Sequence, residues 1–272
     1  MKNILVVGAN GMLGCDLVKV FEEKKYRVSS ATRKDFDVTK IEEVKDFFRE
    51  KTYDLVINTV AYTQVDKSED EREQSFLINE FGARNLAYIT SQSNIPIIYI
   101  STDYVFSGEG TKLYKINDET SPINVYGESK LAGEITTRNF NPRSYIVRTS
   151  WLYGKNGTNF VDTMLELSES RSEISIVDDQ FSCPTWTVEL ASAIEKLFRE
   201  DNQFGTYHLC GSGVISWYKF AKEIFKIKKV DIKVLPVSTD AFPRAAKRPK
   251  FSAMDNNGLL RYWKKSLNEY LS

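Results

Sequence analysis

Apolar and polar positions follow two alternating patterns along the first 150 residues. Short, continuously apolar runs rich in β-branched residues predict buried parallel strands. Stretches in which apolar residues recur every three or four positions predict amphipathic helices. The strands are expected at 3–7, 27–31, 54–58, 96–100 and 145–149, and the helices at 12–24, 40–50, 67–92 and 124–138. This alternation predicts an α/β fold, a parallel sheet with helices on both faces.

The pattern becomes less regular after residue 150. Strands are expected at 173–177 and 207–209, helices at 187–199, 216–226 and 257–271, and turn-rich loops at 178–184 and 237–248. We interpret 1–150 as the main domain and 151–272 as mainly a smaller substrate-binding lobe, with some return of the chain to the main domain. Ligands of α/β proteins bind at the carboxyl edge of the sheet, so this lobe is expected to close over that edge.

The first predicted strand runs into a glycine-rich turn, Gly8-Ala9-Asn10-Gly11-Met12-Leu13-Gly14. Glycines at this spacing permit a tight turn and a close approach of the backbone to a pyrophosphate, and the helix that follows offers free N–H groups. Strand, glycine turn and helix in this order predict a dinucleotide-binding, Rossmann-type doubly wound fold. The expected cofactor contacts are Gly8, Asn10, Gly11, Met12 and Leu13. The alternative is an ordinary turn that binds nothing.

The end of the second predicted strand bears on which dinucleotide binds. An acidic residue there would bind the ribose 2′-hydroxyl of NAD. This strand is followed instead by Thr32-Arg33-Lys34, and Arg33 is placed to meet a 2′-phosphate. NADPH is therefore the expected cofactor, with NADH possible because Asp35 is close. Arg33 and Lys34 could equally form a solvated turn.

Tyr126 and Lys130 lie four residues apart in a predicted helix, so their side chains share one face. An ammonium beside a phenol favours the phenolate, which makes the phenol a usable acid near neutral pH. An apolar strand earlier in the chain ends in Thr102, which places a hydroxyl at the carboxyl edge of the sheet. Taken alone, the Tyr–Lys spacing also fits a solvated helical face, and Thr102 fits a satisfied strand-end hydroxyl.

Composition narrows the class of function. The 272 residues carry 37 basic and 37 acidic side chains, and this zero net charge argues against nucleic acid as a partner. No apolar run approaches the roughly 20 residues that span a bilayer, and the N-terminus is expected to form a strand rather than a signal peptide. The three cysteines have no metal-binding spacing and His208 is the single histidine, so we expect a cytoplasmic protein without a metal site.

The glycine turn and the Tyr126/Lys130 pair together resemble the extended branch of the short-chain dehydrogenase/reductase superfamily. Further segments resemble one family within it, the dTDP-4-dehydrorhamnose reductases. They are Val56–Lys67, Ile100–Phe106, Pro122–Glu134, Arg148–Gly154, Asp179-Gln180 with Pro184-Thr185, and Arg248-Pro249 with Ser252 and Asp255. These segments are distributed along most of the chain, and the Trp151 and Arg248 segments are specific within the superfamily.

The resemblance implies an NADPH-dependent reduction of the C4 keto group of dTDP-4-dehydro-6-deoxy-L-mannose to dTDP-L-rhamnose, in a possible homodimer. It implies that Tyr126 donates the proton, that Lys130 lowers the Tyr126 pKa and holds the nicotinamide ribose, and that Thr102 binds the carbonyl oxygen. Further cofactor contacts implied are Asp37, Val38, Val60, Ala61 and Tyr62. The implied substrate contacts are Val65, Thr102, Asp103, Tyr104, Tyr126, Trp151, Gln180, Thr185 and Arg248.

Two other functions stay open from the residues. Departures from the family pattern at Thr59, Val60, Ser182 and 242–245 leave room for a reductase or epimerase of another nucleotide sugar. The second is a non-catalytic NADP-binding regulatory subunit, because the β subunit of methionine adenosyltransferase also resembles this family. Turnover of keto sugars separates the two classes.

Overall fold

The computed structural model describes residues 1–272 and contains one six-stranded parallel sheet, in the order β10-β5-β4-β3-β1-β2. Its strands are β1 (Asn3–Val7), β2 (Arg27–Ala31), β3 (Leu55–Asn58), β4 (Ile97–Thr102), β5 (Ser144–Thr149) and β10 (Gly205–His208). The inner strands are buried on both faces, as their continuously apolar sequences require. This confirms the expected α/β fold with a parallel central sheet.

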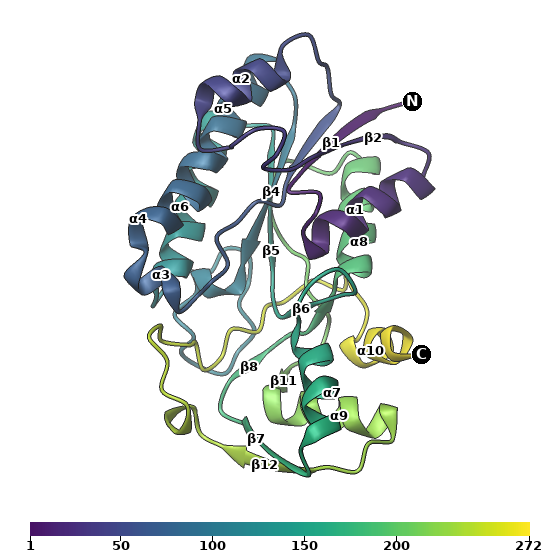
Figure 1. The fold of residues 1–272 in the computed structure, drawn as a ribbon. Helices are drawn as coiled ribbons and strands as arrows, with labels where there is room; N and C mark the ends of the chain where they lie inside the picture. Colours follow the sequence, from purple (N-terminus) through teal and green to yellow (C-terminus); the bar gives the residue numbers. More distant parts are fainter.

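Helices cover both faces of the sheet (Figure 1). One face carries α2 (Ile41–Phe48), α5 (Ala83–Gln92) and α6 (Val125–Phe140), and the other carries α1 (Met12–Glu23) and α8 (Thr187–Arg199). In α1 the buried residues Leu13, Leu17 and Phe21 recur at helical spacing, so one stripe of the helix faces the sheet.

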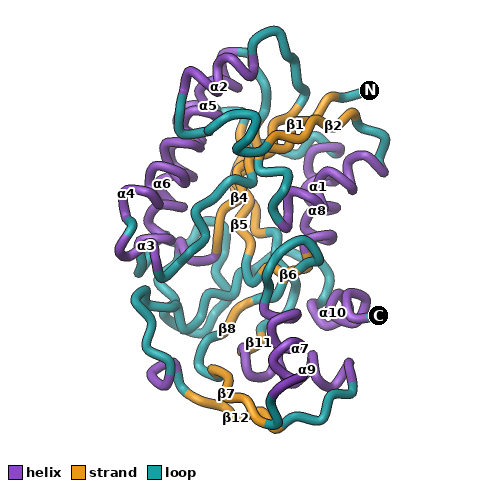
Figure 2. The backbone as a smooth tube through the Cα atoms, in the orientation of Figure 1, coloured by secondary structure: helices purple, strands orange, loops and turns teal.

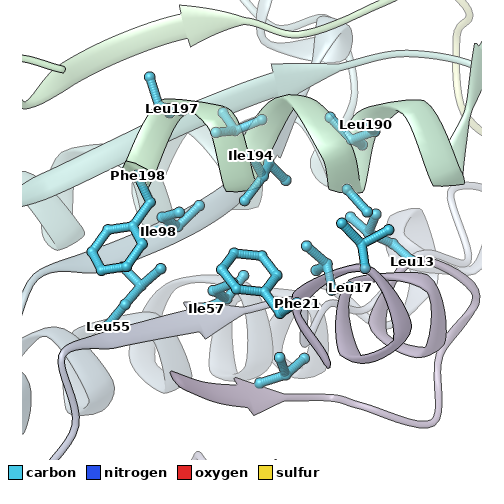
Figure 3. Packing of buried hydrophobic residues seen from close by; sticks show 14 of the residues in the cluster. Leu13, Leu17, Phe21, Leu55, Ile57, Ile98, Leu190, Ile194, Leu197 and Phe198 are labelled. Carbon is cyan, nitrogen blue, oxygen red and sulfur yellow. The ribbon is translucent and has the colours of Figure 1, made fainter. Parts of the chain in front are cut away.

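The largest hydrophobic cluster lies between α1, α8 and the sheet (Figure 3). Phe21 of α1, Ile194 of α8, and Ile57 and Ile98 of the sheet are all fully buried there. Each such side chain contributes about 1.5–3 kcal/mol relative to its exposed state. Helix α8 is therefore stabilised mainly by its packing against α1 and the sheet, although it follows residue 150 in the chain.

The rest of the later chain forms a second layer below the carboxyl edge of the sheet (Figure 2). It contains β6 (Leu152–Tyr153), α7 (Phe160–Ser170), β7 (Glu173–Val177), β8 (Phe181–Ser182), β9 (Thr185–Trp186), β11 (Ile215–Ser216), α9 (Trp217–Lys228), β12 (Lys233–Val237), a 3₁₀ turn (Thr239–Ala241) and α10 (Trp263–Leu271). Phe220, Trp263 and Leu267 lie in its own hydrophobic cluster. The domain boundary at residue 150 stays a prediction. Helix α8 and strand β10 follow it in the chain but pack with the sheet.

The predicted single helix over 67–92 is wrong. The structure has α3 (Lys67–Asp70), α4 (Arg72–Phe76), a π-helical turn (Leu77–Gly82) and then α5. Glu71, at φ −108° and ψ 44°, separates α3 from α4. Within the wider turn, the Asn79 amide accepts from the Tyr62 N–H at 2.8 Å and donates to the Ser129 hydroxyl at 2.8 Å. The irregular turn thus connects the loop after β3 to α6.

Several later elements were not predicted: the two-residue strands β6, β8, β9 and β11, helix α7 and strand β12. Helix α7 has apolar residues at helical spacing, Phe160, Val161, Met164 and Leu165, so the prediction missed a signal that its sequence carries. Its first turn is fixed by the Asn159 side chain, which accepts from the Asp162 N–H at 3.1 Å. Strand β12 pairs in parallel with β7, and Pro236 interrupts its apolar run. The last helix begins at Trp263 rather than 257, because residues 257–262 form a turn and a bridge to Ser212.

Candidate active site

A cavity of about 510 Å³ opens at the carboxyl edge of the sheet, between the ends of β1, β4 and β5. Its lining comes from four regions of the chain: Gly11–Gly14 of the first turn, Thr59, Ala61 and Thr63 after β3, residues 100–103 with Tyr126 and Lys130, and residues 149–152 with Thr158. The structure therefore brings the glycine turn, Thr102, Tyr126, Lys130 and Trp151 to one place.

The glycine turn has the geometry that its sequence requires. Gly8 has φ +83°, and a Cβ there would lie 2.6 Å from the Thr59 hydroxyl oxygen. A Cβ on Gly14 would lie 2.3 Å from the Gly8 carbonyl oxygen, so only glycine lets α1 approach the turn this closely. Gly11, at the N-cap of α1, provides no side-chain cap, and the first N–H groups of the helix are left for a ligand.

A second, smaller cavity of about 250 Å³ lies beside β2 and brings together four of the expected cofactor residues: Arg33, Asp37, Val38 and Val60. The exposed Arg33 guanidinium lies 3.4 Å from the Asp37 carboxylate, at the mouth of this cavity. Tyr62 does not line it. The Tyr62 hydroxyl donates to Glu71 at 2.5 Å, and this bond raises the pKa of Tyr62 to about 12.

Helix α6 places Tyr126 and Lys130 at the main cavity. The Asn124 side chain caps its first turn by accepting from the Gly127 N–H at 2.8 Å, which is why the helix begins at Val125. Gly127 lacks a side chain because a Cβ there would lie 2.3 Å from the Tyr104 carbonyl oxygen. The cap and this close approach hold the first turn of α6 against the residues that follow β4.

The environment of Lys130 differs from the one expected. Its ammonium donates to the Ile100 carbonyl at 2.6 Å and lies 4.1 Å from the centre of the Tyr99 ring. Burial lowers the pKa of Lys130 to about 7, against the opposing effect of Glu134. Lys130 is thus a buried cation held by a carbonyl and an aromatic face, with no ion-pair partner.

The prediction that Lys130 lowers the pKa of Tyr126 is not supported by this structure. Burial raises the pKa of Tyr126 to about 12, the Thr102 hydroxyl opposes this rise, and Asp103 adds to it. The Lys130 ammonium is directed to the Ile100 carbonyl and the Tyr99 ring, and it is not among the groups that shift the pKa of Tyr126. Tyr126 is therefore a protonated phenol at neutral pH.

A buried ion pair fixes the strands beneath the cavity. The Arg148 guanidinium of β5 donates to both oxygens of Glu134 on α6, at 2.9 and 2.7 Å, and Ser101 of β4 donates to the same carboxylate at 2.6 Å. Both charged side chains are almost fully buried. This bidentate pair sets α6, and with it Lys130, against the ends of β4 and β5.

Asp103, expected at the substrate, has its carboxylate bound by three hydroxyl groups. Thr102 Oγ1 lies 3.1 Å from Oδ1, Ser182 Oγ lies 3.0 Å from Oδ2, and Ser252 Oγ also bonds Oδ2. Burial raises the pKa of Asp103 to about 6, although the bonds from Ser252, Ser182 and Thr102 oppose the rise. Asp103 thereby links the end of β4 to two later segments of the chain.

Trp151 lies at the cavity in a strained backbone conformation, with φ +46°. Its ring stacks on Trp217 of α9, with 3.4 Å between ring centres and 8° between planes. A left-handed conformation at a non-glycine residue costs about 1–3 kcal/mol and is retained where surrounding contacts hold it. The stack with Trp217 is such a contact, and it presents the Trp151 ring as a rigid wall.

A cavity of about 330 Å³ lies between the later layer and the loop that follows β3, and its lining includes Gln180, Arg244, Arg248 and Asp66. Arg248 bonds the Asp66 carboxylate at 2.8 Å, and Gln180 donates to Thr239 at 3.0 Å. Tyr104 lines neither this cavity nor the first, but its ring lies 5.8 Å from the Tyr126 ring, and the Arg248 charge opposes the rise that burial causes in its pKa.

Besides Tyr104, two expected substrate residues line none of these cavities. Thr185 is fully buried, donates to the Cys183 carbonyl at 3.2 Å and accepts from the Gly211 N–H at 3.1 Å. Val65 is half-buried beside Asp66. Sequence reasoning in turn missed Thr59, Thr63, Ser150 and Arg244; for Ser150 a signal existed, because a hydroxyl directly follows the strand end at Thr149.

The whole chain, residues 1–272, matches the family model described as the RmlD substrate binding domain. The chain belongs to this family, that of the dTDP-4-dehydrorhamnose reductases. Among its members is the dTDP-4-dehydrorhamnose reductase of Sinorhizobium fredii, which is 35% identical over 95% of this chain and 90% of its own. A spore coat polysaccharide biosynthesis protein of Bacillus subtilis is 37% identical over 100% of this chain and 97% of its own.

Solved structures of this reductase family have the same fold. The dTDP-4-dehydrorhamnose reductase of Clostridium acetobutylicum superposes with a TM-score of 0.96 at 43% identity, covering 99% of this chain and 98% of its own. That of Bacillus anthracis, solved in complex with NADP, gives 0.95 at 40% identity, covering 99% and 98%. Membership of this family explains why the segments from the glycine turn to Arg248 resemble the reductase pattern.

Proposed function

We propose that this protein uses NADPH to reduce the C4 keto group of dTDP-4-dehydro-6-deoxy-L-mannose, which yields dTDP-L-rhamnose. The observation that carries the proposal is the meeting of Thr102, Tyr126 and Lys130 with the glycine turn in one cavity at the carboxyl edge of the sheet. The relatives named above as dTDP-4-dehydrorhamnose reductases, one of them bound to NADP, support both the reaction and the cofactor.

The residues present fit a dinucleotide. The free N–H groups of Gly11–Leu13 suit its pyrophosphate, and the cavity beside β2, with Asp37, Val38 and Val60, suits its adenosine end. Arg33 at the mouth of that cavity suits a 2′-phosphate, and Lys130 and Tyr126 flank the nicotinamide end. When bound, the reduced nicotinamide supplies the hydride to the carbonyl carbon.

The protein's own part in the reaction is to place the carbonyl and to supply a proton. Tyr126 is a protonated phenol at neutral pH, because its pKa is about 12, and an alkoxide that forms beside it takes the phenol proton. Thr102, next to the phenol, binds the same oxygen. Trp151 provides a rigid aromatic wall against one face of the sugar ring.

The cavity with Arg248 fits the nucleoside diphosphate end of the substrate. Two guanidinium groups, Arg248 and Arg244, face one carboxylate, Asp66, so a diphosphate would find an excess of cationic donors. The Tyr104 ring lies 5.8 Å from the Tyr126 ring and its hydroxyl feels the charge of Arg248, which supports a sugar bound between the diphosphate and the proton donor.

Turnover decides the proposal. The purified protein is mixed with NADPH and dTDP-, UDP- and GDP-linked 4-keto sugars, and NADPH consumption is followed together with product analysis. The dTDP sugar should be reduced fastest; faster reduction of a UDP or GDP sugar would instead assign another nucleotide-sugar reductase. Absence of turnover with every sugar, despite tight NADPH binding, would favour the non-catalytic function.

Tyr126→Phe tests the assigned proton donor. Its turnover should fall by roughly 10²–10⁴-fold while its affinity for NADPH stays within about twofold, because only proton supply is lost. Tyr88→Phe, at the exposed surface of α5, is the matched control and should keep wild-type turnover. A Tyr126→Phe variant with near-normal turnover would show that another group supplies the proton.

The cellular setting is part of the proposal. None of the helices combines the length and the apolar character needed to cross a bilayer. We infer a cytoplasmic location from the three free cysteines, two of which are buried, and we retain a homodimer as the proposed assembly. Sedimentation of the purified protein at several concentrations tests the dimer.

A further inference from the structure

The carboxylate of Asp103 lies beside the reacting groups and has no cationic partner. It is 2% exposed, and the side chains that donate to it are all hydroxyls: Thr102 at the end of β4, Ser182 on β8 and Ser252 on the segment before α10. Buried carboxylates without a cation are costly, and their neutral form is correspondingly favoured. The two protonation states of Asp103 are therefore both relevant near neutral pH.

Each state gives the Thr102 hydroxyl a different direction. When Asp103 is ionised, the single Thr102 proton is directed to Asp103 Oδ1 at 3.1 Å, and Thr102 offers the cavity only a lone pair. When Asp103 is protonated on Oδ1, that O–H donates to Thr102 Oγ1 instead. Thr102 then accepts from Asp103 and from the Tyr104 N–H, which lies at 3.2 Å, and its own proton is free to point into the cavity.

The serine contacts are compatible with both states. Ser182 and Ser252 both donate to Oδ2, which accepts two hydrogen bonds whether the group is a carboxylate or a carboxylic acid. Protonation on Oδ1 therefore leaves every one of these polar atoms satisfied. The arrangement favours Oδ1 as the oxygen that carries the proton.

We propose that Asp103 is a positioning residue whose neutral form makes Thr102 a hydrogen-bond donor to the substrate carbonyl oxygen. This inference rests on the reductase function proposed above. An oxygen that gains negative charge during hydride transfer is stabilised by donors and not by lone pairs. Reduction is therefore expected to be fastest when Asp103 is protonated and the Thr102 hydroxyl donates into the cavity.

The other ionisable groups around Asp103 do not compensate its charge. Tyr104 is on its own turn, Tyr126 and Lys130 lie on α6 across the cavity, and Cys183 and Cys210 lie in the neighbouring cluster. Arg248, on the segment that carries Ser252, is paired with Asp66. The pKa of Lys130 is also near neutral, at about 7. Variants of Asp103 are therefore needed to decide whether a change of activity with pH comes from Asp103 or from Lys130.

The test is the pH dependence of kcat/KM, measured with NADPH and the keto sugar on the full-length protein. In the wild type, kcat/KM should decline as the pH rises through a limb near 6, the pKa of Asp103. Asp103→Asn should lack this limb, because its amide N–H donates to Thr102 at every pH, and it should stay at the low-pH level. Asp103→Ala removes the partner that directs the Thr102 hydroxyl, so it should lower kcat by at least roughly tenfold and show no limb near pH 6.

Ser252→Ala shifts the limb without touching Thr102. Loss of a donor to the carboxylate favours the neutral acid, so the limb should move to higher pH. Asp16→Asn is the matched control: Asp16 is also buried and bound by a hydroxyl, that of Thr187 at 2.5 Å, but it lines no cavity described above, and its pH profile should equal the wild type.

The outcomes separate this inference from the function on which it rests. If wild type and Asp103→Asn both turn over and show the same limb, the proposed role of Asp103 is overturned, while the proposed reductase function stands. A limb that moves equally in Ser252→Ala and Asp16→Asn also overturns it, as does an Asp103→Asn variant that folds but turns over as slowly as Asp103→Ala. Absence of turnover in the wild type with every keto sugar overturns both.

Discussion

Replacement of Lys130 by methionine should stabilise the protein without cofactor and abolish its turnover. The ammonium is 2% exposed and has a carbonyl and an aromatic ring as neighbours, with no carboxylate in ion-pair contact. Methionine has a similar length and no charge, so it fills the site without the cost of a buried cation. Stability and activity are thus expected to change in opposite directions.

The size of the effect depends on pH in a calculable way. Burial lowers the pKa of Lys130 from 10.5 to about 7 in the folded protein. Between these values the unfolded chain binds the proton and the folded protein does not, so wild-type stability rises with pH in this window. Loss of this proton on folding costs about 4 kcal/mol at pH 7 and about 2 kcal/mol at pH 9. The stability advantage of Lys130→Met should therefore shrink by about 2 kcal/mol over this range.

Thermal unfolding of both proteins from pH 7 to pH 9, without cofactor, measures this difference. For a domain of this size about 2 kcal/mol corresponds to roughly 4–8 °C in the gap between the two Tm values. Lys196→Met, at an exposed position of α8, controls for the removal of a lysine charge and should show a constant gap. A Lys130→Met gap that is also constant, or that widens with pH, would refute the reasoning from burial.

Three further substitutions test other parts of the site. Arg33→Ala should weaken NADPH by roughly tenfold and NADH by much less, since only NADPH has the 2′-phosphate; fluorescence titration with both cofactors measures this, and equal losses would contradict it. Arg248→Ala should raise KM for the nucleotide sugar by at least roughly tenfold and leave KM for NADPH unchanged in steady-state kinetics; parallel increases would remove Arg248 from the diphosphate site. Glu134→Gln should cost about 3–5 kcal/mol in denaturant unfolding, because it leaves the Arg148 charge buried and uncompensated, and a loss below about 1 kcal/mol would disprove this.

Local pattern was sufficient for most of the sheet layer. The bounds of β1, β2 and α8, and of β7 in the second layer, coincide with their predictions, because the residues that define each element and its flanking turns lie within its own sequence. The helix predicted at 67–92 failed for a non-local reason. Its π-helical turn depends on Asn79 reaching Tyr62 and Ser129, which are distant in sequence.

The same distinction applies to the site. Residues that follow strand ends, such as Thr102, could be assigned to the carboxyl edge from the sequence, because parallel strands all end there. The cavity with Arg248 could not be assembled in this way, since Asp66, Gln180 and Arg248 come from three separate loops. The direction of the Lys130 ammonium was also inaccessible, because it depends on the Ile100 carbonyl and the Tyr99 ring.

The position of α8 on the sheet has a consequence during synthesis. The first five strands of the sheet are complete at Thr149, but α8, which covers α1 and the buried face, ends only at Arg199. A ribosome adding about 5–20 residues per second needs roughly 3–10 s for that interval. During this time the nascent chain presents Leu17, Phe21 and Ile98 to solvent, so it is a candidate for chaperone capture, and a chain terminated there is expected to aggregate.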